Sequence, residues 1–454
     1  MRSVLLLVSA SLLLPGAVCA QDGPVAFVNV AVLPMDRERV LEDHTVLVQD
    51  GLIQEVAPSH RVEFPAGAQV IDGTGLFLMP GLADMHVRLP GPEATQEEIE
   101  QFMFLFLANN VMVVRGMRGT SNHLRLKRDV LSGSLLGPTV FPGSPPMGRV
   151  DAETPESAIG RMMANRSAGY DLQTISDNIS VLVWDSLTEE AHSRGYTFGG
   201  TIPDSVGLRH ALSSGISTIE HLDAYVEEAA SDPIQARLDQ GEDVPLGEVL
   251  TGVVGRKMRA LAAHTRASDT WIVPTMYLWE NRYRPLNPDS LLALPEMSHV
   301  AETMKDDWIF QKGRQEIVDP ETAELMVEVR RRLLRALTMA GVGVLMGTGS
   351  PQMFTVPGFS LRHELRSMEA AGLTPYEILV TGTRNVAEYT RDELLELGNF
   401  GTIAEGNRAD LILLRQNPFQ DLESLWSQEG VMIRGRWIPR AEIDERLGGG
   451  GGSG

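Results

Sequence analysis

The alternation of short apolar runs with longer amphipathic stretches is the feature that most restricts the fold of this chain. Each run is followed by a segment with helical periodicity. The runs lie between positions 77 and 349 and read FLMPGLADMHV, VMVVRGM, TVFPGS, YDLQTIS, YTFGGTI, STIEHLD, WIVPTMY and VGVLMGTG. Repeated strand-then-helix units favour a parallel sheet, and eight of them fit a (β/α)8 barrel. We therefore predict an α/β fold with a TIM-like barrel over 79–396, with any chemistry at the C-terminal ends of its strands.

Runs of a different kind flank the barrel region. Between 25 and 78 the chain has short β-type runs with an Asp50-Gly51 turn, and similar runs return at 401–414 and 431–438. Such runs separated by turns predict a small sheet. We expect 21–78 and 397–447 to form one composite β-sandwich from both ends of the chain. The segments 227–269 and 281–320 are longer than a simple connection between strand and helix needs, and we expect them to be helical insertions over the barrel mouth.

Both termini carry segments that we expect to lie outside the fold. Residues 1–20 have the order of a secretory signal peptide, with a charged residue, an apolar run, a breaker and small residues at Arg2, Val4–Leu14, Pro15-Gly16, Val18 and Ala20. This predicts a secreted or periplasmic protein. The apolar run is too short to cross a bilayer, and no later uncharged run is long enough, so we expect no membrane span. The composition of 448–454, GGGGGSG, is typical of a flexible tail.

Cysteine content and net charge exclude several function classes. Cys19 is the only cysteine and lies within the predicted signal peptide, so the mature chain has no thiol for a disulfide, a zinc-thiolate site or a nucleophile. A lipid anchor at Cys19 is disfavoured by the bulky Val18 before it. With 39 Lys and Arg against 60 Asp and Glu, the net charge is −21. This charge repels phosphate backbones, so we expect no nucleic-acid partner. The sequence leaves the oligomeric state open.

Three motifs carry a resemblance to a known family. They are MPGLADMHVRL at 79–89, STIEHLDAY at 217–225 and GTIAEGNRADLILL at 401–414. In this order they resemble the amidohydrolase superfamily, in particular its secreted imidazolonepropionase-like and prolidase-like branch, over nearly the whole mature chain. The resemblance implies a barrel hydrolase that cleaves C–N bonds in small amides, cyclic amides or dipeptides. Zinc or another divalent cation would polarise the carbonyl and activate a water.

The resemblance also implies metal ligands at set positions of the barrel strands. In the first and fourth strands, this chain has residues that differ from the ligands of the family. The first strand of relatives ends in His-x-His, where this chain has His86 followed by Arg88. A guanidinium stays protonated and cannot ligate a metal. The fourth strand of relatives carries a carboxylated lysine. Its place here falls on Thr174, with Gln173 as the alternative, and neither side chain can be carbamylated.

The later strands depart from the family pattern as well. The histidine of the fifth strand falls on Thr201, whereas the sixth strand keeps His221. The aspartate that ends the eighth strand of relatives, as ligand and general base, is Gly349 here. The resemblance therefore implies a degenerate metal site, and we expect no bound metal or cofactor. The expected pocket at the barrel mouth is lined by His86, Arg88, Thr174, Thr201, His221, Tyr225, Gly349 and Ser350.

These residues predict a pseudoenzyme that keeps a small-molecule or anion pocket, with Arg88 as the anion-binding group. Several alternatives stay open. Arg88 could instead form a structural ion pair with Glu220. The chain could also be an active hydrolase of C–N bonds with an atypical single-metal or metal-free site. Metal-free chemistry could use His221 with Glu220 or Asp223 as acid and base, or Ser350 as nucleophile. The catalytic residues of such an enzyme are not identified by the sequence.

Overall fold

The computed structural model describes residues 23–449 apart from 149, 151, 177, 178, 315–317 and 397. The predicted signal peptide, with Cys19, and the last residues of the tail, 450–454, lie outside the described residues. The C-terminal helix α17 (Arg440–Gly449) extends into the glycine-rich segment as far as Gly449. Within the described ranges, no helix is both long and apolar enough to cross a bilayer.

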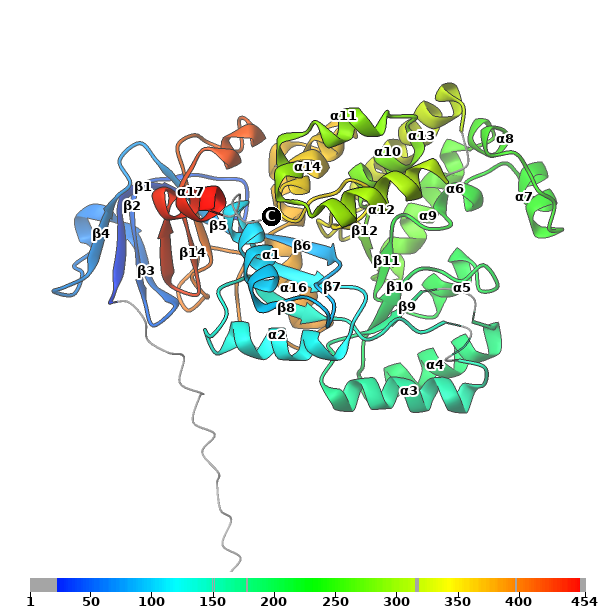
Figure 1. Cartoon of the computed structure of the whole chain (residues 1–454), viewed down its shortest axis with the longest axis horizontal. Coiled ribbons are helices and arrows are strands. Elements are labelled where there is room, and N and C mark those ends of the chain that lie inside the picture. Colours follow the sequence, from blue (N-terminus) through cyan, green and yellow to red (C-terminus); the bar gives the residue numbers. More distant parts are fainter. Residues whose placement is uncertain are drawn as a thin grey trace, which may run out of the picture.

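The centre of the molecule is a barrel of parallel strands, seen edge-on in Figure 1. Two parallel sheets contribute to it, one of three strands and one of four. Their strands are β6 (Leu82–Val87), β7 (Val111–Gly116), β8 (Thr139–Pro142), β9 (Gln173–Ile175), β10 (Phe198–Gly200), β11 (Thr218–Glu220) and β12 (Trp271–Val273). Each coincides with one of the predicted apolar runs.

Backbone contacts close these strands into a ring. A parallel bridge at Leu172 joins the β8 side to the β9 side. The eighth run is extended without forming a regular ladder. Its Val344 bridges to β12, and its Met346 carbonyl accepts a hydrogen bond of 2.7 Å from the Met85 amide of β6. The predicted (β/α)8 barrel is confirmed.

Helices follow the strands and begin and end at recognisable signals. Thr95 and Glu98 form a capping box at the start of the first helix, and Gly169 and Gly195 end two others in the left-handed conformation. The barrel helices are α1 (Gln96–Ala108), α2 (Ser121–Leu131), α3 (Pro155–Ala168), α4 (Val181–Arg194), α5 (Leu208–Ser213), α6 (Tyr225–Glu228), α9 (Gly255–Ala267), α10 (Met276–Tyr283), α13 (Pro320–Met339), α14 (Ser360–Ala370), α15 (Pro375–Thr381) and α16 (Arg384–Asp392).

Strands from both ends of the chain form one mixed, eight-stranded sheet beside the barrel (Figure 1). The antiparallel pairing of β5 with β13 joins the two contributions, which confirms the composite module. Its core includes Phe27, whose ring meets the edge of Trp437 at a centroid distance of 5.3 Å. The strands are β1 (Val25–Val32), β2 (Leu41–Gln49), β3 (Leu52–Pro58), β4 (Gln69–Asp72), β5 (Phe77–Pro80), β13 (Leu411–Leu414), β14 (Gln428–Ile433) and β15 (Arg436–Pro439), with short 3-10 helices η1 (Ser59–Arg61) and η3 (Leu422–Trp426).

Gly81 is the point at which the chain passes from the sheet into the barrel. The sequence predicted one run over 77–87, but the structure divides it into β5 and β6. A Cβ at Gly81 would lie 2.1 Å from Cγ of Met112, and the Gly81 amide donates to the Asp410 carbonyl at 2.8 Å. Only glycine can occupy a position where the backbone approaches its neighbours this closely.

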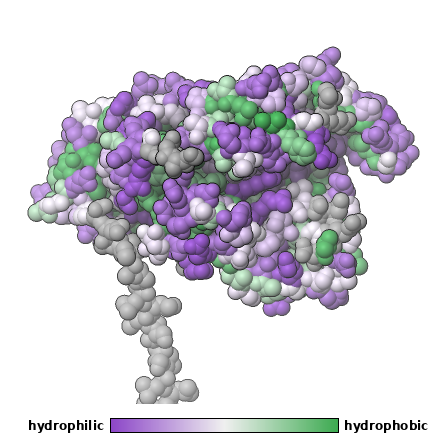
Figure 2. Space-filling model, viewed as in Figure 1, coloured by the Kyte–Doolittle hydropathy of each residue, from purple (hydrophilic) through white to green (hydrophobic). Residues whose placement is uncertain are grey.

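Two helical insertions interrupt the barrel. The first holds α7 (Asp232–Asp239) and α8 (Leu246–Thr251), and the second holds α11 (Pro288–Leu292), η2 (Pro295–His299) and α12 (Glu302–Gly313). Trp308 of α12 is buried and its ring lies 5.6 Å from that of Phe354. Asp307 of α12 is close enough to Arg88, directly after β6, for its charge to oppose the lowering of the pKa of that guanidinium. The second insertion therefore lies over the barrel mouth, and Figure 2 shows hydrophilic residues in the hollow below α12.

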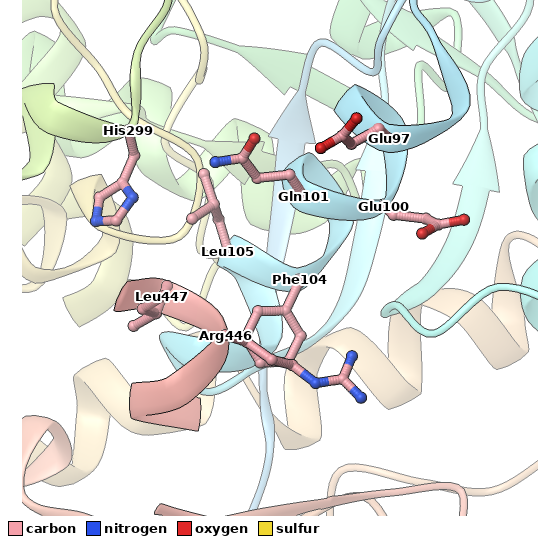
Figure 3. A pocket seen from close by; sticks show the side chains of 8 residues that line it. All are labelled: Glu97, Glu100, Gln101, Phe104, Leu105, His299, Arg446 and Leu447. Atoms are coloured by element: carbon pink, nitrogen blue, oxygen red, sulfur yellow. The ribbon is translucent and has the colours of Figure 1, made fainter. Parts of the chain in front are cut away.

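A small pocket of about 230 Å³ marks where α1, η2 and α17 meet (Figure 3). His299 approaches it from η2, and Arg446 from α17. The Arg446 guanidinium lies 5.1 Å from the ring centroid of Phe104 on α1. The barrel, the second insertion and the C-terminal helix thus share one contact region.

Replacing Trp308 with alanine is expected to release α12 from the barrel. Loss of a buried tryptophan costs about 3–5 kcal/mol, and here the loss falls on an insertion rather than on the barrel core. We expect limited proteolysis under native conditions to cut between 285 and 320 much faster in Trp308→Ala. Phe310→Ala is the matched control, because Phe310 lies in the same helix and is 61% exposed. Equal cleavage of both variants would contradict the anchoring role.

Candidate functional site at the barrel mouth

A buried carboxylate lies at the centre of the site. Glu220 ends β11, and its Oε2 lies 2.6 Å from Nδ1 of His86. Its Oε1 accepts a hydrogen bond of 2.7 Å from Nη2 of Arg115, which is fully buried on β7. The Nε of Arg115 donates to the Met85 carbonyl at 2.8 Å. Glu220 is therefore held on both oxygens by side chains from two other strands.

The charges of this cluster support one another. Burial acts to raise the pKa of Glu220, but Arg115 and His86 outweigh it and hold the pKa below its ordinary value. Burial likewise disfavours the charged form of Arg115, and Glu220 raises the pKa of this guanidinium above its ordinary value. The carboxylate is ionised and the guanidinium is protonated. Removing either partner would leave an uncompensated charge in the barrel interior.

His221 joins the cluster through an unusual backbone conformation. Its φ is 62°, so the regular alternation of side chains stops after Glu220, and both neighbours approach His86. The His86 and His221 rings lie 4.5 Å apart between centroids. Nδ1 of His221 lies 2.7 Å from Oγ1 of Thr275. Burial, followed by the charges of His86 and Arg330, lowers the pKa of His221 well below its ordinary value, so this imidazole is neutral.

Arg88 lies at the rim and keeps unused hydrogen-bonding capacity. Its amide donates to the Ser350 carbonyl at 2.7 Å. Its side-chain Nε is buried and has no partner among the described residues. Burial and the nearby Arg118 lower the pKa of Arg88 to about 10, and Asp307 opposes them. Within the described part of the chain, Arg88 forms no ion pair with Glu220, whose two oxygens contact His86 and Arg115 instead.

Ser350 belongs to a separate buried network. The Asp84 carboxylate accepts hydrogen bonds from the amide and the hydroxyl of Thr348, at 2.9 and 2.5 Å. Oγ of Ser350 lies 2.9 Å from Oγ1 of Thr348. Burial raises the pKa of Asp84 to about 7, although the bonds from Thr348 oppose this shift. In the described part of the chain, no hydrogen bond joins Ser350 to His221.

The threonines that stand at expected ligand positions have other partners. Thr174 is buried, and its hydroxyl donates to the Ser144 carbonyl at 2.7 Å. The alternative position, Gln173, accepts a hydrogen bond of 2.9 Å from Asn165. Thr201 is half-buried after β10, and its amide donates to a carbonyl of β9 at 3.1 Å. Thr174 and Gln173 thus serve the local packing.

Gly349 and Tyr225 complete the set of predicted residues. Gly349 has a φ of 76°, and a Cβ there would lie 2.6 Å from Cδ2 of Leu278. The aspartate of relatives could therefore not be restored without moving the backbone or Leu278. Tyr225 is fully buried, and its hydroxyl lies 2.6 Å from Oγ1 of Thr265 on α9. The structure thus places Tyr225 in the packing between α6 and α9.

The partner of His221 is positioned by a third buried carboxylate. Glu364 of α14 accepts hydrogen bonds from the amides of Met276 and Tyr277, each at 2.8 Å. It thereby caps the start of α10, directly after Thr275, whose φ is 45°. Burial raises the pKa of Glu364 to about 8. The helix that follows the seventh strand is thus fixed by a protonatable group from a helix far along the chain.

The residues present do not fit a divalent cation. The resemblance implies a cation held by several donors, whereas His86 and His221 are the only imidazoles at the expected positions. Across the described residues, no three His, Cys, Asp or Glu side chains converge into a group that could hold a metal ion. The positive charges of Arg88 and Arg330 also act on His221. Two donors beside fixed cations make a weak site, because affinity depends on ligand number and charge.

Arg115 is the functional residue that sequence reasoning missed. The signal was an arginine inside the apolar run VMVVRGM, because a charged residue in a buried strand requires a partner. Its hydrogen bonds also reach the hydroxyl of Tyr389, at 2.9 Å, and that of Thr218, at 3.3 Å. Thr275 and Arg330 gave no comparable signal in the sequence.

Comparison with known proteins gives a consistent fold. No family model matches the chain. A Bifidobacterium longum protein provisionally assigned as a prolidase is similar in structure, with a TM-score of 0.68 and 22% identity over 94% of this chain and 98% of that one. Bottromycin amidohydrolase gives a TM-score of 0.68 and 19% identity over 94% and 91% of the two chains. These likenesses show that the chain has the fold of amidohydrolases.

A short stretch also matches curated sequences. The chain is 47% identical over 53 residues to a dihydroorotase of Streptococcus pneumoniae serotype 4. The match spans only 12% of this chain and 12% of that protein. It therefore indicates local similarity and does not by itself extend to the activity of the whole protein.

Replacing Arg115 with methionine is expected to lower the free energy of unfolding by about 3–5 kcal/mol, because Glu220 would stay buried without its cation. Adding Glu220→Gln should recover part of this loss. Arg391→Met removes an exposed pair with Asp392 and should change stability by less than about 0.5 kcal/mol. Urea unfolding of the four proteins measures these differences. A double variant less stable than Arg115→Met would contradict the charge argument.

Glu364→Gln is expected to flatten the pH dependence of stability. The pKa of Glu364 rises from 4.5 to about 8 on folding, so between these values the native state holds a proton that the unfolded state has released. Its contribution is therefore complete at low pH and is lost as the pH rises toward 8. Unfolding in urea from pH 5 to pH 8 should show a shallower decline for the variant. Glu328→Gln, at an exposed position, controls for the loss of one charge. An unchanged slope would contradict the assignment.

Proposed function

We propose that this chain is an exported member of the amidohydrolase superfamily that has lost its metal centre and binds a small anionic molecule at the barrel mouth as a pseudoenzyme. The observation that carries the proposal is the buried Nε of Arg88 at the rim, which has no partner among the described residues. Export is inferred from residues 1–20 of the sequence. Members of the superfamily generally use divalent metals, so the loss of the metal is the specific step in this proposal.

The loss of the metal centre is supported by the way the former ligand positions are used. The hydroxyl of Thr174 is committed to Ser144, and a Cβ at Gly349 would meet the side chain of Leu278 at 2.6 Å. Glu220 and Arg115 add a compensated ion pair inside the barrel. The charge of the Glu220 carboxylate is thus balanced by a side chain of the protein itself.

Anion binding is supported by the chemistry of the rim. A buried guanidinium nitrogen without an acceptor is costly, and a carboxylate or phosphate oxygen would satisfy it. Arg118 lies near Arg88 and adds a second positive charge. Asp307 of α12 is a carboxylate close enough to Arg88 to act on its charge, so it would repel a bound anion unless its side chain turned away.

A second candidate function is metal-free hydrolysis of amides, cyclic amides or dipeptides. The pairing of His86 with Glu220 at 2.6 Å favours it, because a carboxylate that holds one ring nitrogen orients the imidazole as an acid or base. In such an enzyme His86 would transfer the proton and Glu220 would be a positioning residue. Turnover of an amide substrate by the metal-free protein, abolished in His86→Asn, would favour this function over the first.

Ligand binding is tested by thermal stability with acetate, succinate or inorganic phosphate at constant ionic strength. A ligand present at about 100 times its Kd should raise the Tm by roughly 2–5 °C. We expect this shift to disappear in Arg88→Ala and to persist in Arg61→Ala, which changes an exposed arginine of the sheet module. Equal shifts in all three proteins, or no shift in any, would overturn the proposed pocket.

The proposed loss of the metal centre is tested by measuring the metal content of the protein. After growth and dialysis with zinc or manganese, elemental analysis of the purified protein should find far less than one ion per chain, because two imidazoles beside cations bind weakly. His86→Ala should give the same value. Stoichiometric metal in the wild-type protein that is absent from His86→Ala would show that the centre is retained.

A further inference from the structure

A second, unrelated surface feature is a basic groove on the outside of the barrel. It has a volume of about 600 Å³ and is bounded by α9, α13 and the end of α14, which are labelled in Figure 1. Four arginines line it, namely Arg259 on α9 and Arg331, Arg332 and Arg335 on α13. Glu328 is the only carboxylate among the lining residues. This concentration of positive charge contrasts with the net charge of −21 of the whole chain.

Two of the four arginines have no ionic partner within the described ranges. Arg331 pairs with Glu280 at 3.0 Å, and Arg335 pairs with Glu377 at 3.3 Å. Arg259 and Arg332 are exposed and form no ion pair with a described residue. Elsewhere on this acidic chain many arginines are paired with a neighbouring carboxylate, so two unpaired guanidinium groups at one groove are available to an external anionic group.

The other residues that line the groove, which we call its floor, are apolar and mostly small. Met339 at the end of α13 is 74% exposed, and alanines of α13 and of the α14 end lie beside it. Small residues let a partner backbone approach closely, and methionine adapts to different apolar surfaces. Arginine and methionine are also enriched at protein interfaces. The groove therefore combines charge recognition with a contact area for apolar side chains.

We propose that this groove is a docking site for an acidic amphipathic segment of a partner protein, whose carboxylates pair with Arg259 and Arg332 and whose apolar side chains cover Met339. The inference goes beyond the proposed function and does not depend on it. A short acidic segment is favoured over a nucleic acid, because the remaining surface of the chain would repel a long polyanion. It is favoured over a free small anion because the floor offers apolar contact as well as charge.

The test measures fluorescence anisotropy with a fluorescein-labelled helical peptide of about ten residues, carrying glutamate on one face and leucine on the other. Binding to the full-length protein is compared with binding to the double variant Arg259→Glu/Arg332→Glu. Because two charge pairs become repulsive, we expect the affinity to fall at least about tenfold. A peptide with serine in place of leucine should also bind more weakly to the wild-type protein.

The matched control is Arg61→Glu/Arg128→Glu. Both of its arginines are exposed and form no ion pair with a described residue, and the net charge changes by the same amount. We expect this control to bind the acidic peptide as the wild-type protein does. Thermal unfolding of all three proteins should coincide, since none of the four arginines supports the fold through an ion pair.

Four outcomes would overturn the proposal. The first is that the wild-type protein does not bind the peptide, and the second is that binding weakens equally in the groove variant and in the control. The third is that a single-stranded oligonucleotide binds as tightly as the peptide and that the groove variant loses this binding too. The fourth is that the wild-type protein sediments as a dimer and that Arg259→Glu/Arg332→Glu dissociates it. The third result would identify a general polyanion site, and the fourth would identify a second copy of the chain as the occupant.

Discussion

The contact between Arg115 and Glu220, extended by His86, is the interaction on which the barrel mouth depends. A carboxylate in the barrel interior is tolerable only when both its oxygens are satisfied, and here a guanidinium at 2.7 Å and an imidazole at 2.6 Å satisfy them. This pairing fixes the His86 ring through its Nδ1. Arg88, at the rim, takes no part in this pairing, and its buried Nε has no partner among the described residues.

The same rule of satisfied polar groups applies to the rest of the mouth. Asp84 is bonded to Thr348, Thr174 to Ser144, and Glu364 to the first amides of α10. Side chains engaged in this way stabilise the site but are not free to hold a cation or a substrate. Among the described residues, buried side-chain atoms without a partner include Nε of Arg88, below the insertion that carries Asp307, and also Oδ2 of Asp223, Nε of Arg330 and Nε1 of Trp279. The proposed binding role rests on the first of these.

The fold was largely predictable because it depends on local patterns. Apolar runs followed by amphipathic helices identified every strand of the barrel, and the turn signals near both ends identified the composite sheet. The break at Gly81 was missed, since the close approach of Met112 is invisible in the sequence. The site was less predictable. The sequence neither selected Arg115 nor placed Tyr225 in the packing against α9.

The sequence by itself determined the α/β barrel with its composite sheet and the strong negative charge, whereas the degenerate metal site stays a prediction from the family resemblance. Only the tertiary structure decided which polar groups pair. Arg115 and Glu220 are 105 positions apart, and His86 and Glu220 are 134 apart, so no local pattern connects them. Closure of the barrel brings these strands together, and the cost of burying an unpaired charge then selects the partners.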